Sequence, residues 1–230
     1  MRKVLGVYSS PRPHWVGDGF PARSIFSYAS HGDHVSPFLL LDYAGPAEFK
    51  PAAKGSDHRR GVGIHPHRGF ERVTLVYQGE LEHRDSTGNG GTIGAGGAGS
   101  LRVIAGTYNK IEGPARTFTP VNLWDVSLRQ NMTVTLPIPD GHTAMLVVLS
   151  GAVTINDDKQ ATEAQLVLLD RKGTDVRIEA QNNTSFLVLS GEPIDEPVVI
   201  HGPFVMNSTE EISSALRDFQ NGHFGKISVS

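Results

Sequence analysis

The chain has 230 residues, no cysteine and a formal net charge of −3. Without cysteine it forms no disulfide, no zinc–thiolate site and no thiol nucleophile. Its 21 Lys and Arg residues are scattered along the sequence, which disfavours nucleic acid and anionic membrane as partners. No apolar run approaches the roughly 18 residues of a membrane span, and residues 1–10 lack a signal-peptide core, so we expect a cytoplasmic protein.

Short apolar runs separated by Gly and Pro fill most of the sequence. This spacing of Gly and Pro is typical of many short strands joined by turns, and it predicts an all-β sandwich or barrel rather than a βαβ sheet. The runs cover residues 38–41, 73–77, 101–104, 121–126, 132–136, 144–149, 153–155, 166–169, 176–178, 186–189 and 198–200.

A single helix is indicated strongly, near the C-terminus. Ser208 begins a capping box with Glu211, and residues 221–222 (Asn-Gly) end the helical pattern. The apolar positions between them fall on one helical face that we expect to pack on the β structure. They are Ile212, Ala215, Leu216 and Phe219.

An internal repeat divides the chain into two related halves. Residues 74–81 and 145–153 each show an apolar strand, a Gly turn and an alternating strand. The glycine-dense segment 90–99 lies between the two copies. We therefore predict two β-barrel domains, residues 1–97 and residues 98–230.

The segment with the clearest chemistry is residues 63–71 (GIHPHRGFE). In an extended chain His65 and His67 project to the same face, and Pro66 favours that conformation at a barrel rim. Neutral imidazoles suit Fe, Ni, Cu or Zn, so the pair is a candidate metal site. The alternative is that both are rim histidines that hydrogen-bond to backbone.

Residues 65–71 (HPHRGFE), together with 79–86 (GELEHRDS), closely resemble the pirin family, a group of bicupins in the cupin superfamily. Further similarity lies in residues 17–21, 37–42, 116–120, 141–144 and 202–207, so that it covers nearly the whole chain. The resemblance implies an all-β fold of two cupin-type barrels with one short C-terminal helix, the first barrel carrying the metal site.

Pirins bind one Fe through three His and one Glu, and the resemblance assigns His65 and His67 to the first ligand pair. It implies one divalent transition metal, Fe first, with Ni, Mn, Co or Cu as alternatives. The second pair, an HxE motif, is missing, because the turn at residues 93–96 leads almost directly to residue 101. About 40–60 residues of closing strands are absent. Either the natural protein carries a mobile segment that this sequence lacks, or the segment is deleted and the metal lost with it.

Replacement ligands are scarce if nothing is missing. Glu71 matches the general cupin pattern, and a bend at Gly69 would turn it toward the pair. His83 follows Leu81 at strand spacing, but a core or rim role is the favoured interpretation for it. His142 has no histidine beside it, so we expect no metal in the second barrel. The remaining histidines are expected to be solvated, and the sequence identifies no catalytic residue.

Two functions follow from the resemblance. The favoured one is a quercetin 2,3-dioxygenase activity on a small aromatic, flavonol-like substrate, with O₂ adding across the C ring and carbon monoxide leaving. The alternative is a non-catalytic iron-binding regulator whose partner is a transcription factor or a metabolic enzyme. In either case we expect a monomer without direct contact to nucleic acid or membrane.

Overall fold

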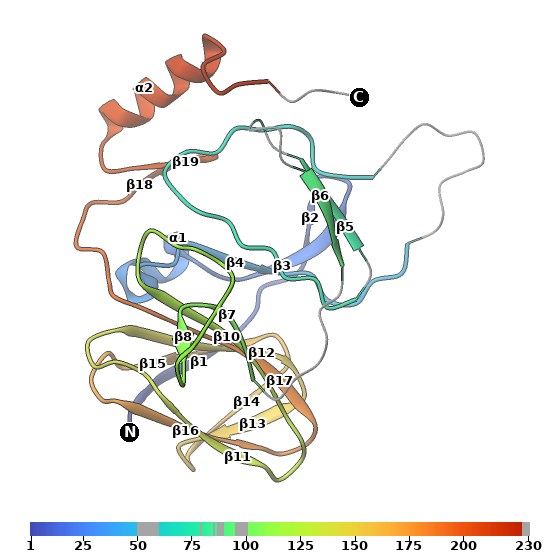
Figure 1. Ribbon diagram of the computed structural model, residues 1–230, viewed down its shortest axis with the longest axis vertical. Helices are drawn as coiled ribbons and strands as arrows, with labels where there is room; N and C mark the ends of the chain where they lie inside the picture. The colour runs from blue at the N-terminus through green and yellow to red at the C-terminus, as the bar shows by residue number, and fades with distance from the viewer. Residues whose placement is uncertain (50–59, 79, 85, 87–89, 95–100, 227–230) are drawn as a thin grey trace. The chain divides into compact units, whose positions relative to one another are not determined.

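The computed structural model describes residues 1–49, 60–78, 80–84, 86, 90–94 and 101–226. The chain divides into two compact units, and each consists of two separate stretches of sequence. The first unit comprises residues 1–61 and 98–194, and the second comprises residues 62–97 and 195–230. Figure 1 traces the chain and labels its elements.

Two antiparallel sheets form the main body of the first unit. The larger sheet has six strands in the order β1-β15-β12-β17-β10-β7, and the other has four strands in the order β11-β16-β13-β14. The six are β1 (Val4–Ser9), β15 (Gln165–Leu169), β12 (Thr143–Ser150), β17 (Thr184–Gly191), β10 (Val121–Leu128) and β7 (Leu101–Ala105). The four are β11 (Thr133–Pro137), β16 (Asp175–Ala180), β13 (Ala152–Ile155) and β14 (Lys159–Thr162).

The hydrophobic core of this unit takes side chains from both sheets. Trp124 and Phe186 come from the larger sheet, and Leu136, Ile155 and Ile178 from the smaller, all within one buried cluster. The alternation of buried and less buried residues in β16 reflects the two-residue period of a strand with one face in the core. The two sheets therefore enclose a single core between their facing sides.

The N-terminal strand β1 belongs to this body although it is far from its partner in sequence. Val7 of β1 pairs with Val167 of β15 in an antiparallel ladder. Arg2, only 1% exposed, precedes the strand and donates hydrogen bonds to the carbonyl oxygens of His142 (2.9 Å), Asp170 (2.6 Å) and Pro139. These bonds tie the start of the chain to residues 139–170.

Smaller elements complete the first unit. They are a three-stranded sheet of β2 (His14–Val16), β3 (Phe20–Ser27) and β4 (Leu40–Tyr43), the helix α1 (Tyr28–His31), the 3-10 helix η1 (Gly32–Val35), and the hairpin of β8 (Thr107–Tyr108) and β9 (Ile111–Glu112). In α1 the Ser27 side chain accepts a hydrogen bond from the Ser30 N–H, which caps the first turn.

The second unit combines two hairpins and the long helix. The hairpins are β5 (Glu80–Arg84) with β6 (Gly90–Gly94), and β18 (Val199–His201) with β19 (Phe204–Met206); the helix α2 spans Thr209–Gln220. Ile212 and Ala215 of α2 pack with Phe204 of β19 in a small buried cluster. The Ser208 side chain accepts from the Glu211 N–H and the C-cap is Asn221, so the predicted helix and both its ends are confirmed. The Glu211 side chain accepts from the Asn207 N–H, so the reciprocal half of the predicted capping box forms one residue earlier.

The mostly β fold predicted from the sequence is confirmed, and α1 is a short helix that the sequence did not indicate. All predicted strand runs but one coincide with or overlap a strand. The exception is residues 73–77, which are described but carry no strand assignment, so that prediction was wrong. Val73, the first residue of this run, is 45% exposed.

Candidate metal site

The two predicted ligands lie in an irregular stretch of the second unit. Residues 61–67 carry no strand assignment, and Pro66 separates the two histidines. The His65 and His67 rings nevertheless lie together, with centroids 4.5 Å apart and planes at 88°. His67 also contacts Phe70 edge-on at 5.1 Å. Proximity of the two imidazoles therefore does not depend on a regular strand.

Each imidazole has one feature that suits metal binding. In His65, Nδ1–H donates to the Gly63 carbonyl oxygen at 2.6 Å, which leaves Nε2 as the ring nitrogen that a metal would bind. Desolvation, with smaller contributions from His65 and Arg72, lowers the pKa of His67 below its ordinary value. A neutral imidazole with one nitrogen free is the ligand that divalent transition metals accept.

Arg68, directly after the pair, anchors this stretch to the C-terminal part of the second unit. Its backbone bridges Phe204 of β19, with the Val205 N–H donating to the Arg68 carbonyl oxygen at 3.0 Å. Its guanidinium donates to Asp218 Oδ2 of α2 at 2.7 Å and lies 4.4 Å from the Phe224 ring centroid. The hydrogen bond from Arg68 is the main reason that the pKa of Asp218 is lowered.

Gly69 permits the close approach of this stretch to β19. Its φ is +90°, a conformation that L side chains rarely adopt, and a Cβ there would lie 1.7 Å from the Val205 carbonyl oxygen. A side chain at residue 69 would therefore push the two segments apart. This contact gives Gly69 a structural role beside the bend that the sequence indicated.

The other candidate ligands do not complete the site. In the parts of the chain that the structure describes, no three His, Asp or Glu side chains come together to hold a metal, so Glu71 does not join the pair there. The backbone of His83 lies in β5, but its side chain is outside the described residues. His142 lies in the first unit just before β12, with Nδ1 buried and without a hydrogen-bond partner among the described residues. The donor set thus fits a transition metal in kind and supplies two ligands.

Comparison with known proteins identifies the family. The sequence profile of the pirin family matches residues 19–124, and that of the pirin C-terminal cupin domain matches residues 123–225. A Pseudomonas aeruginosa protein, provisionally named a quercetin 2,3-dioxygenase, is 45% identical over 287 positions that cover 97% of this chain and 99% of the relative. The chain belongs to the pirin family. The predicted all-β cupin fold is thereby confirmed.

Other related proteins agree with this assignment. Rat pirin is 30% identical over an alignment covering 83% of this chain and 84% of the relative. A crystal structure of quercetin 2,3-dioxygenase from Acinetobacter baumannii matches with a TM-score of 0.91 and 39% identity, covering 99% of this chain and 100% of that one. A pirin from Escherichia coli in complex with nickel(II) shares the fold, with a TM-score of 0.62 at 16% identity over 82% of this chain and 100% of that one.

The alignment with the Pseudomonas pirin also bears on the missing stretch. It runs over 287 positions, more than the 230 residues of this chain, so several dozen positions of the relative have no counterpart here. Because both proteins are covered almost end to end, those positions lie inside the chain. This agrees with the expectation that an internal segment is absent.

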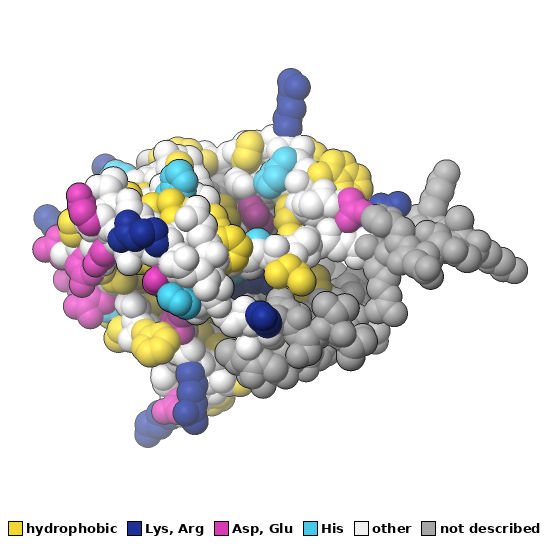
Figure 2. Space-filling model, turned by 90° about the horizontal axis from the view of Figure 1, so that it is seen from above, with side chains coloured by type: hydrophobic (Ala, Val, Ile, Leu, Met, Phe, Trp, Pro, Cys, Tyr) yellow, Lys and Arg dark blue, Asp and Glu magenta, His cyan; other side chains and the backbone are white. Residues whose placement is uncertain are grey.

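The surface and the helices bear on the other predicted partners. On the face drawn in Figure 2, the Lys and Arg side chains of the described residues stand singly or in small groups rather than as a continuous stripe. No described helix is long and apolar enough to cross a membrane. The exclusion of nucleic acid and membrane stays a prediction, as does the domain division at residues 97 and 98.

Proposed function

We propose that this pirin is a metal-dependent dioxygenase that opens the C ring of a flavonol such as quercetin with O₂. The observation that carries the proposal is the closely spaced His65–His67 pair, with Nε2 of His65 left available by the Nδ1 contact to Gly63. Names of related proteins support the substrate class, since two of the relatives above are called quercetin 2,3-dioxygenases.

In this proposal His65 and His67 hold one divalent transition metal, Fe first, with Ni, Mn, Co or Cu as alternatives. A bound metal would supply Lewis acidity and a template on which flavonol and O₂ are brought together. The chain's own residues hold the imidazoles in place: the Gly63 carbonyl oxygen accepts from His65 Nδ1–H, and Arg68 ties the stretch to β19 and α2. The absence of cysteine fits a reducing compartment, and we propose that the protein acts in the cytoplasm.

The test is a spectroscopic assay on protein loaded with Fe(II) without oxygen. Quercetin added anaerobically is expected to show a shifted flavonol absorption that bleaches when O₂ is admitted, and His67→Ala is expected to lose both effects. His201→Ala, which removes an exposed histidine of the same unit, is the control. Fully loaded protein that never bleaches quercetin would contradict the dioxygenase.

A second function is favoured by one specific observation. Among the described residues the pair has no third ligand, and several dozen positions of the related pirin have no counterpart here. Two imidazoles bind a metal more weakly than a four-ligand site, which favours a non-catalytic regulator that binds a transcription factor or metabolic enzyme. Native mass spectrometry bears on the choice: bound metal is expected of either function and leaves the quercetin assay to decide, whereas a 24.8 kDa chain without metal would contradict the dioxygenase and favour a regulator that acts without metal.

A further inference from the structure

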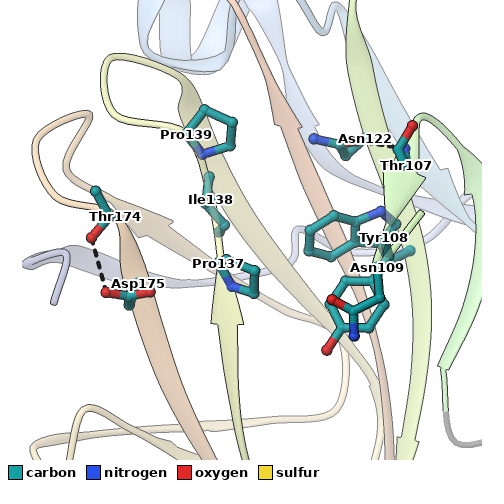
Figure 3. A pocket seen from close by; sticks show the side chains of 10 residues that line it. Thr107, Tyr108, Asn109, Asn122, Pro137, Ile138, Pro139, Thr174 and Asp175 are labelled. Atoms are coloured by element: carbon teal, nitrogen blue, oxygen red, sulfur yellow. Dashed lines mark hydrogen bonds between the residues drawn. The ribbon is translucent and has the colours of Figure 1, made fainter. Parts of the chain in front are cut away.

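A cleft in the first unit lies away from the histidine pair in sequence and belongs to a different part of the fold. Its volume is about 400 Å³, and it is lined by the β8–β9 hairpin, by β10 and by the end of β11. Figure 3 shows Tyr108 and Asn109 on one side of Pro137, Ile138 and Pro139. A volume of this size accommodates a ligand of one or two aromatic rings.

The floor of the cleft is aromatic and apolar. Trp124 is 2% exposed and Ile138 is 1% exposed, and both belong to the core between the two sheets. The Tyr108 ring meets the Trp124 ring edge-on, with centroids 5.1 Å apart and planes at 68°. A planar ring entering the cleft would find aromatic edges and aliphatic carbon, the surfaces that favour aromatic ligands.

The polar groups of the cleft differ in whether they already make hydrogen bonds within the protein. The Thr107 N–H donates to Asn122 Oδ1 at 3.0 Å, and Asn122 Nδ2 donates to Ser190 Oγ at 3.2 Å, so Asn122 is occupied. Trp124 Nε1 is buried and has no hydrogen-bond partner among the described residues. A buried indole N–H without an acceptor is costly, so an oxygen that reached it would be favoured.

Charge narrows the class of ligand. Asp175 is the one charged residue among the described residues that line the cleft, and its Oδ2 accepts a hydrogen bond from Thr174 Oγ1 at 2.9 Å. A carboxylate at the cleft repels an anionic ligand, and the chain as a whole carries a net charge of −3. A neutral aromatic ring that bears a carbonyl and a hydroxyl group fits the cleft. Its carbonyl oxygen can accept from Trp124 Nε1–H, its hydroxyl can donate to the Asp175 carboxylate, and it carries no negative charge for Asp175 to repel.

We propose that this cleft is a second ligand site, separate from the histidine pair, that binds neutral, planar, oxygen-bearing aromatic compounds. The ring lies against Trp124 and Ile138, and a ligand oxygen accepts from Trp124 Nε1. Because that nitrogen is buried in the free protein, binding requires a local movement of the residues that cover it. Asp175 selects against anions of the same size.

The test uses the indole N–H as its own reporter. The chain has two tryptophans, and Trp15 is 57% exposed on β2, outside the cleft. In a Trp15→Phe variant a single indole N–H resonance, that of Trp124, remains in a ¹H–¹⁵N spectrum. Metal-free protein is titrated with para-hydroxyacetophenone, which is neutral, and with para-hydroxybenzoate, an anion of similar size.

The neutral probe is expected to shift the indole resonance saturably, and the anion is expected to bind about fivefold more weakly. Asp175→Asn is expected to remove most of that difference, because it deletes the charge and keeps the shape. Asp158→Asn, the same change at an exposed carboxylate on the turn between β13 and β14, is the matched control and should leave the difference intact.

Two results would overturn the proposal. One is an indole resonance that stays unshifted at saturating neutral probe, or shifts only linearly with its concentration. The other is a preference for the neutral probe that Asp175→Asn leaves as large as in the parent. Since neither probe requires bound metal, both results are independent of whether the dioxygenase proposal holds.

Discussion

At the scale of single residues, the candidate site depends on the immediate surroundings of two neighbouring imidazoles. The Nδ1 contact of His65 to the Gly63 carbonyl oxygen fixes one tautomer, and desolvation lowers the pKa of its neighbour His67. These are effects of immediate surroundings, and each can be removed by a single substitution.

Replacing either histidine is expected to weaken metal binding by the pair strongly. Loss of one of two ligands should weaken Ni(II) or Co(II) binding by well over about tenfold, since loss of an outer partner alone costs 10–100-fold in known sites. Isothermal titration calorimetry of His65→Ala and His67→Ala, with His201→Ala as control, measures this. Equal affinities in all proteins would place the metal elsewhere.

His31 makes folding stability depend on pH. Its pKa is lowered, chiefly by desolvation, so the unfolded chain binds this proton more readily than the folded chain. Stability from this group is therefore complete above the ordinary His pKa of about 6.5 and is lost as pH falls through the lower folded value. Urea unfolding between about pH 5 and 8 should show a shallower loss of stability on acidification for His31→Gln than for the parent.

At the scale of elements, the stretch that carries the histidines is held by its contact with β19 and α2 rather than by a ladder of its own. Arg68 supplies a backbone bridge to Phe204, an ion pair with Asp218 and a contact with the Phe224 ring. Gly69 lets the two backbones approach. The C-terminal helix therefore supports a site whose ligands lie far away in sequence.

Arg68→Ala is expected to weaken metal binding by about tenfold while the protein still folds, because the ligand stretch loses its anchor but keeps both imidazoles. Arg68→Lys should restore part of the affinity through the ion pair with Asp218. Metal titration followed by hydrogen exchange of residues 62–70 reports both effects. The control is Arg217→Ala, which removes an exposed arginine of α2, the helix that carries Asp218. A similar loss of affinity in that variant would show that the effect comes from any change in α2 and not from the Arg68 contact.

At the scale of the whole molecule, the N-terminus is built into the body formed mainly by residues 98–194. Strand β1 pairs with β15, and the buried Arg2 side chain bonds to three carbonyl oxygens of residues 139–170. Burial lowers the pKa of Arg2, although nearby Asp140 and Asp170 oppose that shift. The first residues of the chain thus contribute to the stability of a sheet assembled from much later ones.

Arg2→Met is expected to destabilise the first unit by about 2–4 kcal/mol, since three carbonyl oxygens lose a charged donor. Urea denaturation followed by the fluorescence of Trp124, in the Trp15→Phe background, measures the change. Lys3→Met, next to it in the chain and exposed, provides the comparison. A destabilisation equal to that of Lys3→Met would show that the buried bonds contribute little.

Much of the fold could be predicted because its causes are local. Apolar runs between turn residues indicated the strands, and Ser208 with Glu211 indicated the helix α2, since capping and alternation act over a few residues. Residues 73–77 show the limit: their apolar pattern predicts a strand, but a strand forms only where a partner is available to pair with it.

The candidate site, too, could be predicted from the sequence only in part. His65 and His67 could be chosen from sequence alone, because two residues so close in the chain lie together in almost any extended conformation. The anchoring of Arg68 by Asp218, the pairing of β1 with β15 and the cleft beside Trp124 join segments many residues apart. Local patterns do not specify such contacts, because chain packing as a whole determines which distant residues meet. The sequence by itself determined the family and the candidate pair, and the tertiary structure decided which residues support that pair.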